Sequence, residues 1–254
     1  MRKRAAPFLT NVAVRPDVEL DRERFPTSLP FLPTLVLALS TPVTFFVGEN
    51  GTGKSTLLEG IAGLCGLPVS GGGRNDLIAA AGRESDCHLL PHLLGSFRRK
   101  PRDGYFFRAE LLAQFASLLE QRQADPDFPR DPFARYGGRS LHTRSHGEAF
   151  LRVFASWMGE GILLIDEPEA ALSPQRQLAL LVQMAELCRE KTVQLIIATH
   201  SPILLTFPGA TLLSFDADAI APIELRDTSH YAITRGILED PERYWRHLLA
   251  EEEE

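Results

Sequence analysis

The chain has 254 residues and a formal net charge of −6, with 27 lysines and arginines against 33 aspartates and glutamates. Four of the negative charges lie in the terminal glutamate run at residues 251–254, so the rest of the chain is nearly neutral. This weak acidity argues against a protein that coats nucleic acid through a large basic face. A hydrophobic content of 44% excludes a disordered or collagen-like chain and predicts a globular one with a sizeable core.

The apolar segments are too short to cross a membrane. Runs such as residues 35–39 and 162–165 end after four or five residues, whereas a spanning helix needs about 20. The basic start of the chain is not followed by the apolar segment of a secretory signal. We therefore expect a cytoplasmic protein that reaches a membrane only through a partner.

Strands and helices alternate in three places along the chain. The expected strands lie at residues 42–47, 161–165 and 193–199, and the expected helices run from residue 55, from 174 to 190, and from 202. The second and third helices begin with Ser-Pro, a favourable start because proline has no N–H to leave unpaired there. Strands that are apolar throughout and separated by helices favour an α/β fold with a mostly parallel sheet.

The middle of the chain predicts antiparallel strands and a small helical part. Residues 94–99 and 105–108 flank the sequence Lys-Pro-Arg-Asp-Gly, which is rich in turn residues, so we expect a hairpin. An apolar-periodic helix is expected at residues 111–121, followed by a polar loop at 124–139. The glycine-rich stretch at 68–83 predicts a surface loop.

A phosphate-binding motif follows the first strand. Its sequence Gly-Glu-Asn-Gly-Thr-Gly-Lys-Ser matches the P-loop pattern G-x-x-x-x-G-K-[ST] at every fixed position. Backbone N–H groups of such a loop bind phosphate oxygens, Lys54 reaches the β- and γ-phosphates, and Ser55 offers a hydroxyl to Mg²⁺. The expected nucleotide-binding residues are Gly48, Glu49, Asn50, Gly51, Thr52, Gly53, Lys54, Ser55 and Thr56.

Two carboxylates and a histidine follow the other predicted strands. Asp166 can bind Mg²⁺, and its neighbour Glu167 can orient or deprotonate a water. Ligands bind at the carboxyl ends of strands in open α/β sheets, and Gly48, Asp166 and His200 all lie at that edge. We therefore expect His200 to sense the γ-phosphate. A solvated Asp-Glu turn and a structural histidine are the alternatives when each feature is taken alone.

Together these motifs resemble those of ABC-type ATPases. Gly-Glu-Asn-Gly-Thr-Gly-Lys-Ser-Thr, Ile-Asp-Glu-Pro-Glu-Ala-Ala-Leu-Ser-Pro and Ala-Thr-His-Ser-Pro look like the Walker A, Walker B with D-loop, and H-loop motifs. The nearest resemblance is to small stand-alone ATPases of the AAA family, related to the heads of structural-maintenance-of-chromosomes and DNA-repair ATPases. It covers roughly residues 40–206. It implies a P-loop NTPase fold in one domain, residues 1–254, with an antiparallel β portion and a small helical subdomain at about 110–145.

The resemblance also implies a site shared between two copies of the chain. Those relatives carry Arg-Ser-His-Gly-Glu where transporters carry Leu-Ser-Gly-Gly-Gln, and the same five residues stand at 144–148. In the family this signature contacts the γ-phosphate bound to the opposite subunit, which implies an ATP-dependent homodimer. The matching residues are Ser145, His146, Gly147 and Glu148. His146 replaces a glycine of the transporter pattern, and a surface histidine in a helix-cap turn is the alternative.

Two further positions are expected from the family pattern. The Q-loop residue, which would reach Mg²⁺, should leave a strand between Walker A and the signature, and we assign it to Glu110, with Gln114 as the alternative. An aromatic residue that stacks on adenine should come from the N-terminal region. Phe25 and Phe31 are candidates, although phenylalanine is commonly buried in a core.

The resulting hypothesis is an Mg²⁺-dependent ATP hydrolase that dimerises head to tail around ATP, with Lys54, Glu167 and His200 as catalytic residues. One alternative is the nucleotide-binding subunit of an ABC transporter with separate membrane subunits, against which the signature and Ser173, in place of a D-loop aspartate, argue. Another is a DNA-associated repair or defence ATPase that would use the basic tip of the expected hairpin, formed by Arg98, Arg99, Lys100 and Arg102. The protein partner that the ATP cycle serves is left open.

Overall fold

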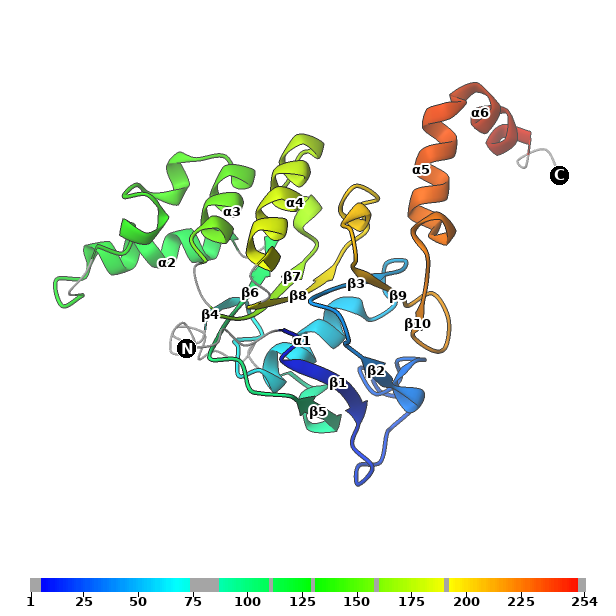
Figure 1. Cartoon of the computed structure of the whole chain (residues 1–254), viewed down its shortest axis with the longest axis horizontal. Helices are drawn as coiled ribbons and strands as arrows, with labels where there is room; N and C mark the ends of the chain where they lie inside the picture. Colours follow the sequence, from blue (N-terminus) through cyan, green and yellow to red (C-terminus); the bar gives the residue numbers. More distant parts are fainter. Residues whose placement is uncertain are drawn as a thin grey trace.

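The structure is a computed structural model of the chain, and it describes residues 6–73, 87–109, 112–128, 131–157, 160–189 and 192–250. Two sheets and the helices around them make up this part of the chain (Figure 1). The strands are β1 (Leu9–Val14), β2 (Val36–Ala38), β3 (Val43–Val47), β4 (Gly72–Gly73), β5 (Leu93–Phe97), β6 (Asp103–Arg108), β7 (Gly161–Asp166), β8 (Val193–Ala198), β9 (Thr211–Ser214) and β10 (Ala221–Pro222). The helices are α1 (Lys54–Leu64), α2 (Leu112–Ala124), α3 (His146–Ala155), α4 (Pro174–Arg189), α5 (Ser229–Glu239) and α6 (Pro241–Ala250).

The larger sheet is mostly parallel. Within the described residues it has seven strands, in the order β10-β9-β3-β8-β7-β6-β4. The strands from β9 to β6 are parallel to their neighbours, and the edge strands β10 and β4 are antiparallel. This confirms the predicted α/β fold, and it places the consecutive motif-bearing strands β3, β8 and β7 side by side at the centre.

Alternate residues of the central strands face opposite sides of the sheet. Phe46, Leu164 and Ile196 belong to the core shared with α1, whereas their chain neighbours Phe45 and Ile165 belong to the core shared with α3 and α4. Figure 1 shows α1 below the sheet and α3 and α4 above it. Because both faces are covered, the central strands β3, β7 and β8 are buried throughout and mostly apolar, which is the pattern that the sequence shows.

The smaller sheet is antiparallel and joins the larger one through a buried glutamine. It has the order β2-β1-β5. Gln194 of β8 is fully buried; its Oε1 accepts hydrogen bonds from the N–H groups of Phe8 and Leu9, and its Nε2 donates to the Leu9 carbonyl. A single side chain thereby satisfies three backbone groups at the start of β1, which fixes the small sheet on the large one.

The predicted hairpin is wrong. β5 pairs with β1 in the small sheet, and β6 pairs with β7 and β4 in the large one, so the two strands do not pair with each other. Gly104, expected in the turn, lies inside β6, where an added Cβ would come within 2.9 Å of the Ile162 carbonyl oxygen. The glycine is therefore needed for close packing against β7 rather than for a turn. The basic residues expected at the tip lie in the connection between β5 and β6, where Arg99 pairs with Glu160 at 2.9 Å.

The expected helix from residue 202 is also wrong. The chain there forms only a three-residue 3-10 turn, Leu204–Thr206, and the hydroxyl of Ser201 accepts a hydrogen bond from the Leu204 N–H. Pro208 disfavours a helical conformation at Phe207, and Gly209 then adopts a left-handed φ of 74°. The other expected helices and strands agree with the observed bounds within a few residues. The expected loop at 68–83 includes β4 and otherwise lies mostly outside the described residues.

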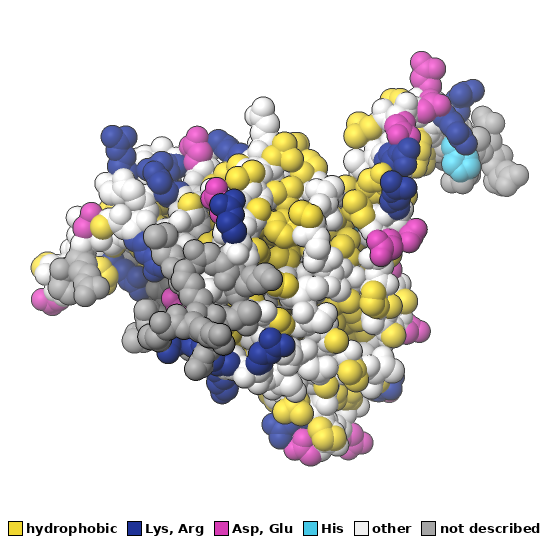
Figure 2. Space-filling view, in the orientation of Figure 1, with side chains coloured by type: hydrophobic (Ala, Val, Ile, Leu, Met, Phe, Trp, Pro, Cys, Tyr) yellow, Lys and Arg dark blue, Asp and Glu magenta, His cyan; other side chains and the backbone are white. Residues whose placement is uncertain are grey.

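The last two helices form an arm that projects from the body (Figure 1). A Cβ at Gly236 would lie 2.5 Å from the ring of Tyr244, so this glycine lets α6 pack closely against α5. Figure 2 shows both acidic and basic side chains along the arm. Its exposed large apolar side chains are Ile233, Leu238, Trp245, Leu248 and Leu249. No helix in the described ranges is long and apolar enough to span a membrane.

Candidate nucleotide-binding site

Four polar segments meet at the carboxyl edge of the large sheet. The P-loop follows β3, Asp166 ends β7, His200 comes shortly after β8, and Asp216 comes shortly after β9. Since β9, β3, β8 and β7 are consecutive parallel strands, their carboxyl ends lie next to one another. The structure thus brings together the motifs that the sequence places at this edge.

The P-loop approaches its neighbours too closely for larger residues at two glycines. A Cβ at Gly48 would lie 2.8 Å from Oδ1 of Asp216, and one at Gly53 would lie 2.7 Å from Leu29. Both glycines also have positive φ, 149° and 93°, which a residue with a side chain rarely adopts. The loop conformation that opens α1 therefore depends on these two residues.

Lys54 is buried at the start of α1. Its Nζ donates to the carbonyl oxygens of Gly48 and Glu49, at 2.7 and 2.8 Å. Burial lowers the pKa of Lys54, and the nearby carboxylates, of which Glu167 has the largest effect, oppose that shift. The ammonium group is thus held inside the loop, beside the backbone that would surround a phosphate.

Ser55 and Asp166 are joined across the site. The Ser55 hydroxyl donates to Oδ1 of Asp166 at 2.9 Å. Burial raises the pKa of Asp166 to about 6, although this hydrogen bond and the guanidinium of Arg108, 3.7 Å from Oδ2, favour the charged form. A hydroxyl and a buried carboxylate that point at the same place form an oxygen donor pair of the kind that Mg²⁺ prefers.

Glu167 has a strained backbone that separates its side chain from that of Asp166. Its φ of 46° and ψ of 55° lie in the left-handed region, and within the described chain it is the one residue other than glycine with positive φ. Its N–H donates to the Ala198 carbonyl at 3.0 Å, which ties the turn to β8. Such strain persists only where the surroundings enforce it and occurs mainly at functional sites. The side chain is half-exposed, and Oε1 lies 3.6 Å from Nε2 of His200.

His200 is fixed through both its backbone and its ring. Its N–H donates to Glu169, which also accepts from the Thr199 hydroxyl, and its Nδ1 lies 2.9 Å from Nε2 of His230. Burial, followed by Lys54 and then His230, lowers the pKa of His200, so the ring is neutral at pH 7. Nε2 is buried and has no hydrogen-bond partner among the described residues.

These residues fit a nucleotide and a magnesium ion. No side chain of the described residues caps the start of α1, so its first N–H groups can bind phosphate oxygens. The unpartnered Nε2 of His200 faces the same edge, and an unpartnered buried nitrogen favours a ligand.

Comparisons with known proteins agree with this geometry. A family model described as "AAA domain, putative AbiEii toxin, Type IV TA system" matches residues 83–206, and one described as "AAA domain" matches residues 29–97. The hemin import ATP-binding protein of Burkholderia thailandensis is 30% identical over 191 residues, which cover 64% of this chain and 70% of that protein. The chain belongs to the ABC-type ATPases. The hemin import ATP-binding protein of Rhodopseudomonas palustris is also 30% identical, over 61% of this chain.

The match to the first curated relatives of this ABC-type ATPase covers only part of their length. The chain spans 58% and 63% of the length of the first two. Among solved structures, an ATP-binding cassette of an ABC transporter has a TM-score of 0.52 at 14% identity and covers 93% of this chain and 97% of that one. At this identity the match shows the fold alone.

The signature of this ABC-type ATPase lies at the start of α3, on the opposite side of the sheet from α1 (Figure 1). Ser145 and Glu148 form a reciprocal capping box, and Arg176 of α4 donates to Glu148 at 3.2 Å. His146 is exposed, whereas Gly147 is buried and its Cβ would lie 2.8 Å from the Ala171 carbonyl oxygen. The signature is therefore not brought to the P-loop of the same chain, and its role in a second copy stays a prediction.

The remaining positions expected from the family are the Q-loop residue and the aromatic residue that stacks on adenine. Glu110, the expected Q-loop residue, lies outside the described residues, and Gln114 is exposed in the first turn of α2. Phe31 is buried and packs edge-on against Phe215, so it is a core residue rather than an adenine contact. Phe25 is 70% exposed and stays a candidate.

Four residues of the site were not predicted from the sequence. Asp216 accepts from the Glu49 N–H at 2.7 Å, Arg108 donates to Glu59 at 2.8 Å, and Glu169 and His230 hold His200. Asp216 and Arg108 stand at or just after the ends of apolar strands, which is a usable signal. Glu169 and His230 carry no such signal.

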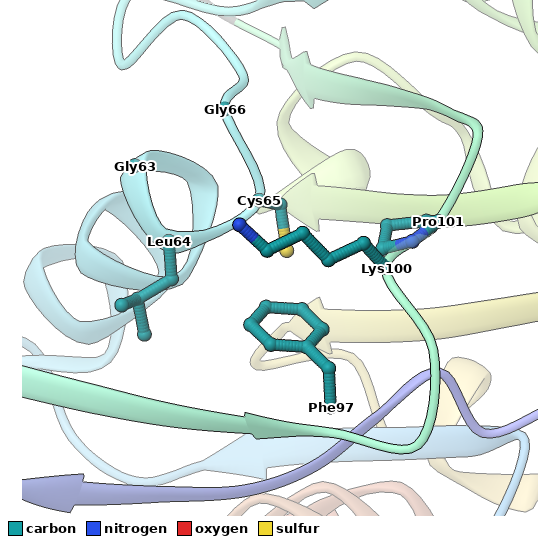
Figure 3. A pocket seen from close by; sticks show the side chains of 7 residues that line it. All are labelled: Gly63, Leu64, Cys65, Gly66, Phe97, Lys100 and Pro101. Carbon is teal, nitrogen blue, oxygen red and sulfur yellow. The ribbon is translucent and has the colours of Figure 1, made fainter.

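A pocket beside Lys100 and Cys65 lies at the wrong end of α1 to belong to the site (Figure 3). Its other lining residues are Gly63, Leu64, Gly66, Phe97 and Pro101. The P-loop opens α1, and an 11-residue helix is about 16 Å long. Lys100, expected at a basic hairpin tip, lies instead by the carbonyl end of this helix.

Asparagine at position 166 is expected to stabilise the protein when neither magnesium nor nucleotide is added. The native state raises the pKa of Asp166 from 3.8 to about 6, so it binds more protons than the unfolded state between these values and loses stability as pH rises through them. Relative to pH values below 3.8, the titration of Asp166 costs the wild type about 3 kcal/mol of folding stability at pH 7.5 and about half of that at pH 5. Asp166→Asn lacks this titration and should be more stable than the wild type by similar amounts. Urea unfolding of Asp166→Asn at both pH values measures the difference, with the exposed Asp218→Asn as control. Equal stability of the variant and the wild type at pH 7.5 would contradict this account.

Proposed function

We propose that the protein binds ATP with Mg²⁺ and hydrolyses it, and that two copies join head to tail around the nucleotide. The observation that carries the proposal is the hydrogen bond between Ser55 and Asp166 beside the P-loop. It joins the hydroxyl and the carboxylate expected to hold the metal, next to the buried ammonium of Lys54 and the carboxylate of Glu167. This combination suits phosphoryl transfer to water.

Each residue of the site has a definite part in the proposed reaction. The N–H groups of the loop and the ammonium of Lys54 bind the β- and γ-phosphates. Glu167, half-exposed and held away from Asp166 by its left-handed backbone, accepts the proton of the attacking water. His200 is neutral and donates from Nε2 to the γ-phosphate.

Mg²⁺ would be held by Ser55 and Asp166 and, when bound, would neutralise charge on the phosphate oxygens. Before the metal binds, the negative charge of Asp166 is stabilised by the hydrogen bond from Ser55 and, more weakly, by the guanidinium of Arg108. Arg108 also pairs with Glu59 and accordingly keeps its position when the carboxylate changes partner. The proposal thus needs no rearrangement of β6.

The homodimer is proposed because of the place of the signature. Ser145, His146 and Glu148 are exposed at the start of α3, away from the P-loop of their own chain. The positive end of a capped helix that carries no ligand of its own suits an anion supplied by another molecule. A nucleotide bound to a second copy is such an anion.

Replacing Lys54 with methionine tests the proposed function. The variant keeps the length of the side chain but removes the ammonium, and a hydrogen bond to a charged group contributes about 1.5–3 kcal/mol, so MgATP should bind roughly 10- to 150-fold more weakly. Titration with a fluorescent ATP analogue measures binding, and phosphate release measures hydrolysis. Lys100→Met, at the other end of α1, is the matched control and should behave as the wild type. Absence of ATP turnover by the wild type would overturn the proposal.

A second candidate function is the ATP-binding subunit of an importer with separate membrane subunits. The names of the two hemin import relatives favour it. Co-purification of an integral membrane protein from detergent extracts would support it. The DNA-associated alternative loses the hairpin tip on which it was based, since its four basic residues lie in the connection between β5 of one sheet and β6 of the other.

A further inference from the structure

His200 has two ring nitrogens with different surroundings. Nε2 is buried, lacks a hydrogen-bond partner among the described residues, and lies 3.6 Å from the Glu167 carboxylate. Nδ1 lies 2.9 Å from Nε2 of His230, and the two ring centroids are 4.9 Å apart. A contact this short between two ring nitrogens requires that one of them carry the proton and the other accept it.

His230 lies in the first turn of α5, whose N-cap residue is buried. Thr228, the N-cap of this helix, is 1% exposed and donates from its hydroxyl to the Leu225 carbonyl at 2.8 Å. The same hydroxyl oxygen accepts from the Tyr231 N–H, so the cap fixes the turn that carries His230. The Ser229 hydroxyl lies 3.4 Å from both Oε1 of Glu49 in the P-loop and Nδ1 of His230. A hydroxyl has one proton, and a neutral His230 donates from Nε2 when that proton goes to its Nδ1. The start of α5 therefore contacts the site at two points.

The direction of the hydrogen bond decides which nitrogen of His200 can face a phosphate. If His230 donates, His200 accepts at Nδ1 and keeps its own proton on Nε2, which can then donate to an anion. If His200 donates from Nδ1, Nε2 presents a lone pair, which repels an anion. A neutral ring of His200 can serve a phosphate only in the first arrangement.

We propose that His230 is a positioning residue, which donates a hydrogen bond to Nδ1 of His200 and thereby keeps the proton and the ring plane of His200 directed at the γ-phosphate. This inference rests on the proposed function, since it assigns a role in the same site. It adds α5 to the elements that build the site. Helices α5 and α6 pack on each other, so the projecting arm is attached directly to the γ-phosphate contact.

The test compares two variants that differ in the ability to donate. His230→Gln retains an N–H group near the position of Nε2, whereas His230→Met has a similar length and no donor. Since one hydrogen bond contributes about 1 kcal/mol, we expect His230→Met to lower kcat for ATP roughly 5- to 10-fold with KM changed less than about 2-fold, and His230→Gln to restore most of kcat. A purely structural role would lower thermal stability in both variants and would not be rescued by glutamine.

The protonation of His200 is observable without any nucleotide. Nitrogen-15 NMR of the imidazole rings distinguishes a proton on Nε2 from one on Nδ1, and His200→Gln assigns the signal. We expect the Nε2-protonated form in the wild type and in His230→Gln, and a mixture of forms in His230→Met. A proton on Nδ1 in the wild type, or equal kcat in His230→Met and the wild type, overturns the inference. A wild type that does not hydrolyse ATP overturns the proposed function instead.

Discussion

Glutamine at position 167 is expected to lower kcat for ATP hydrolysis about 100- to 10,000-fold, the range contributed by a general base. The amide keeps the size of the side chain and does not take a proton from water, so MgATP binding should stay within a few-fold of the wild type. Because hydrolysis no longer removes the γ-phosphate, the ATP-bound homodimer should accumulate. Light scattering with and without MgATP measures this change in molar mass, and phosphate release measures kcat.

Glu186→Gln is the matched control for this variant. Glu186 is an exposed carboxylate on α4, outside the site, and the same change there should leave both turnover and molar mass as in the wild type. Normal ATP turnover by Glu167→Gln would remove Glu167 from the reaction. Retained ATP binding without any dimer would mean that residues 144–148 do not act across two copies and that a different subunit completes the site.

Aspartate at position 146 should prevent the dimer that Glu167→Gln accumulates. His146 is the exposed first residue of α3, where a negative charge is favourable for the helix, so the substitution should not destabilise the fold. In the dimer the same charge would face the γ-phosphate of the other copy, and a like-charge contact costs several kcal/mol. The double variant should then dimerise at least about 100-fold more weakly with MgATP.

The exposure of the side chains decides both the control for His146→Asp and the choice of position 146. Gln121→Glu adds the same charge on an exposed part of α2 and should leave dimerisation unchanged. Gly147 is unsuitable because an added Cβ would meet the Ala171 carbonyl oxygen, and Ser145 and Glu148 are needed for the capping box. If His146→Asp still dimerises in the Glu167→Gln background, the signature does not face the nucleotide of a second copy.

The sequence predicted those parts of the site whose geometry is local. The P-loop needs glycines at fixed spacing between a strand and a helix. Asp166 ends a strand that is buried on both faces, and His200 comes two residues after another such strand. Parallel pairing then brings these strand ends together without further information. The Walker A loop, Asp166, Glu167 and His200 therefore all lie at one edge of the sheet, as expected.

The wrong hairpin and the site residues that were missed depend on contacts between distant segments. β5 comes just before the turn-like residues and β6 begins within them, which suggests a hairpin, yet β5 pairs with β1, a strand at the start of the chain. His230 contacts His200 only because α5 returns to the carboxyl edge after β10, a path that residue patterns near position 230 do not encode. Asp216 likewise contacts Glu49 across 167 residues of chain. Local propensity carries no information about such contacts.

Lys54 hydrogen-bonds the carbonyl oxygens of its own loop, and this has a consequence for the thermodynamics of nucleotide binding. A phosphate that binds to Lys54 replaces partners that the ammonium already has, so the gain is the difference between two sets of hydrogen bonds. The measured affinity therefore understates the strength of the lysine–phosphate contact. When the nucleotide leaves, the ammonium of Lys54 can return to the carbonyl oxygens of its own loop. Release therefore need not leave the buried ammonium without a partner.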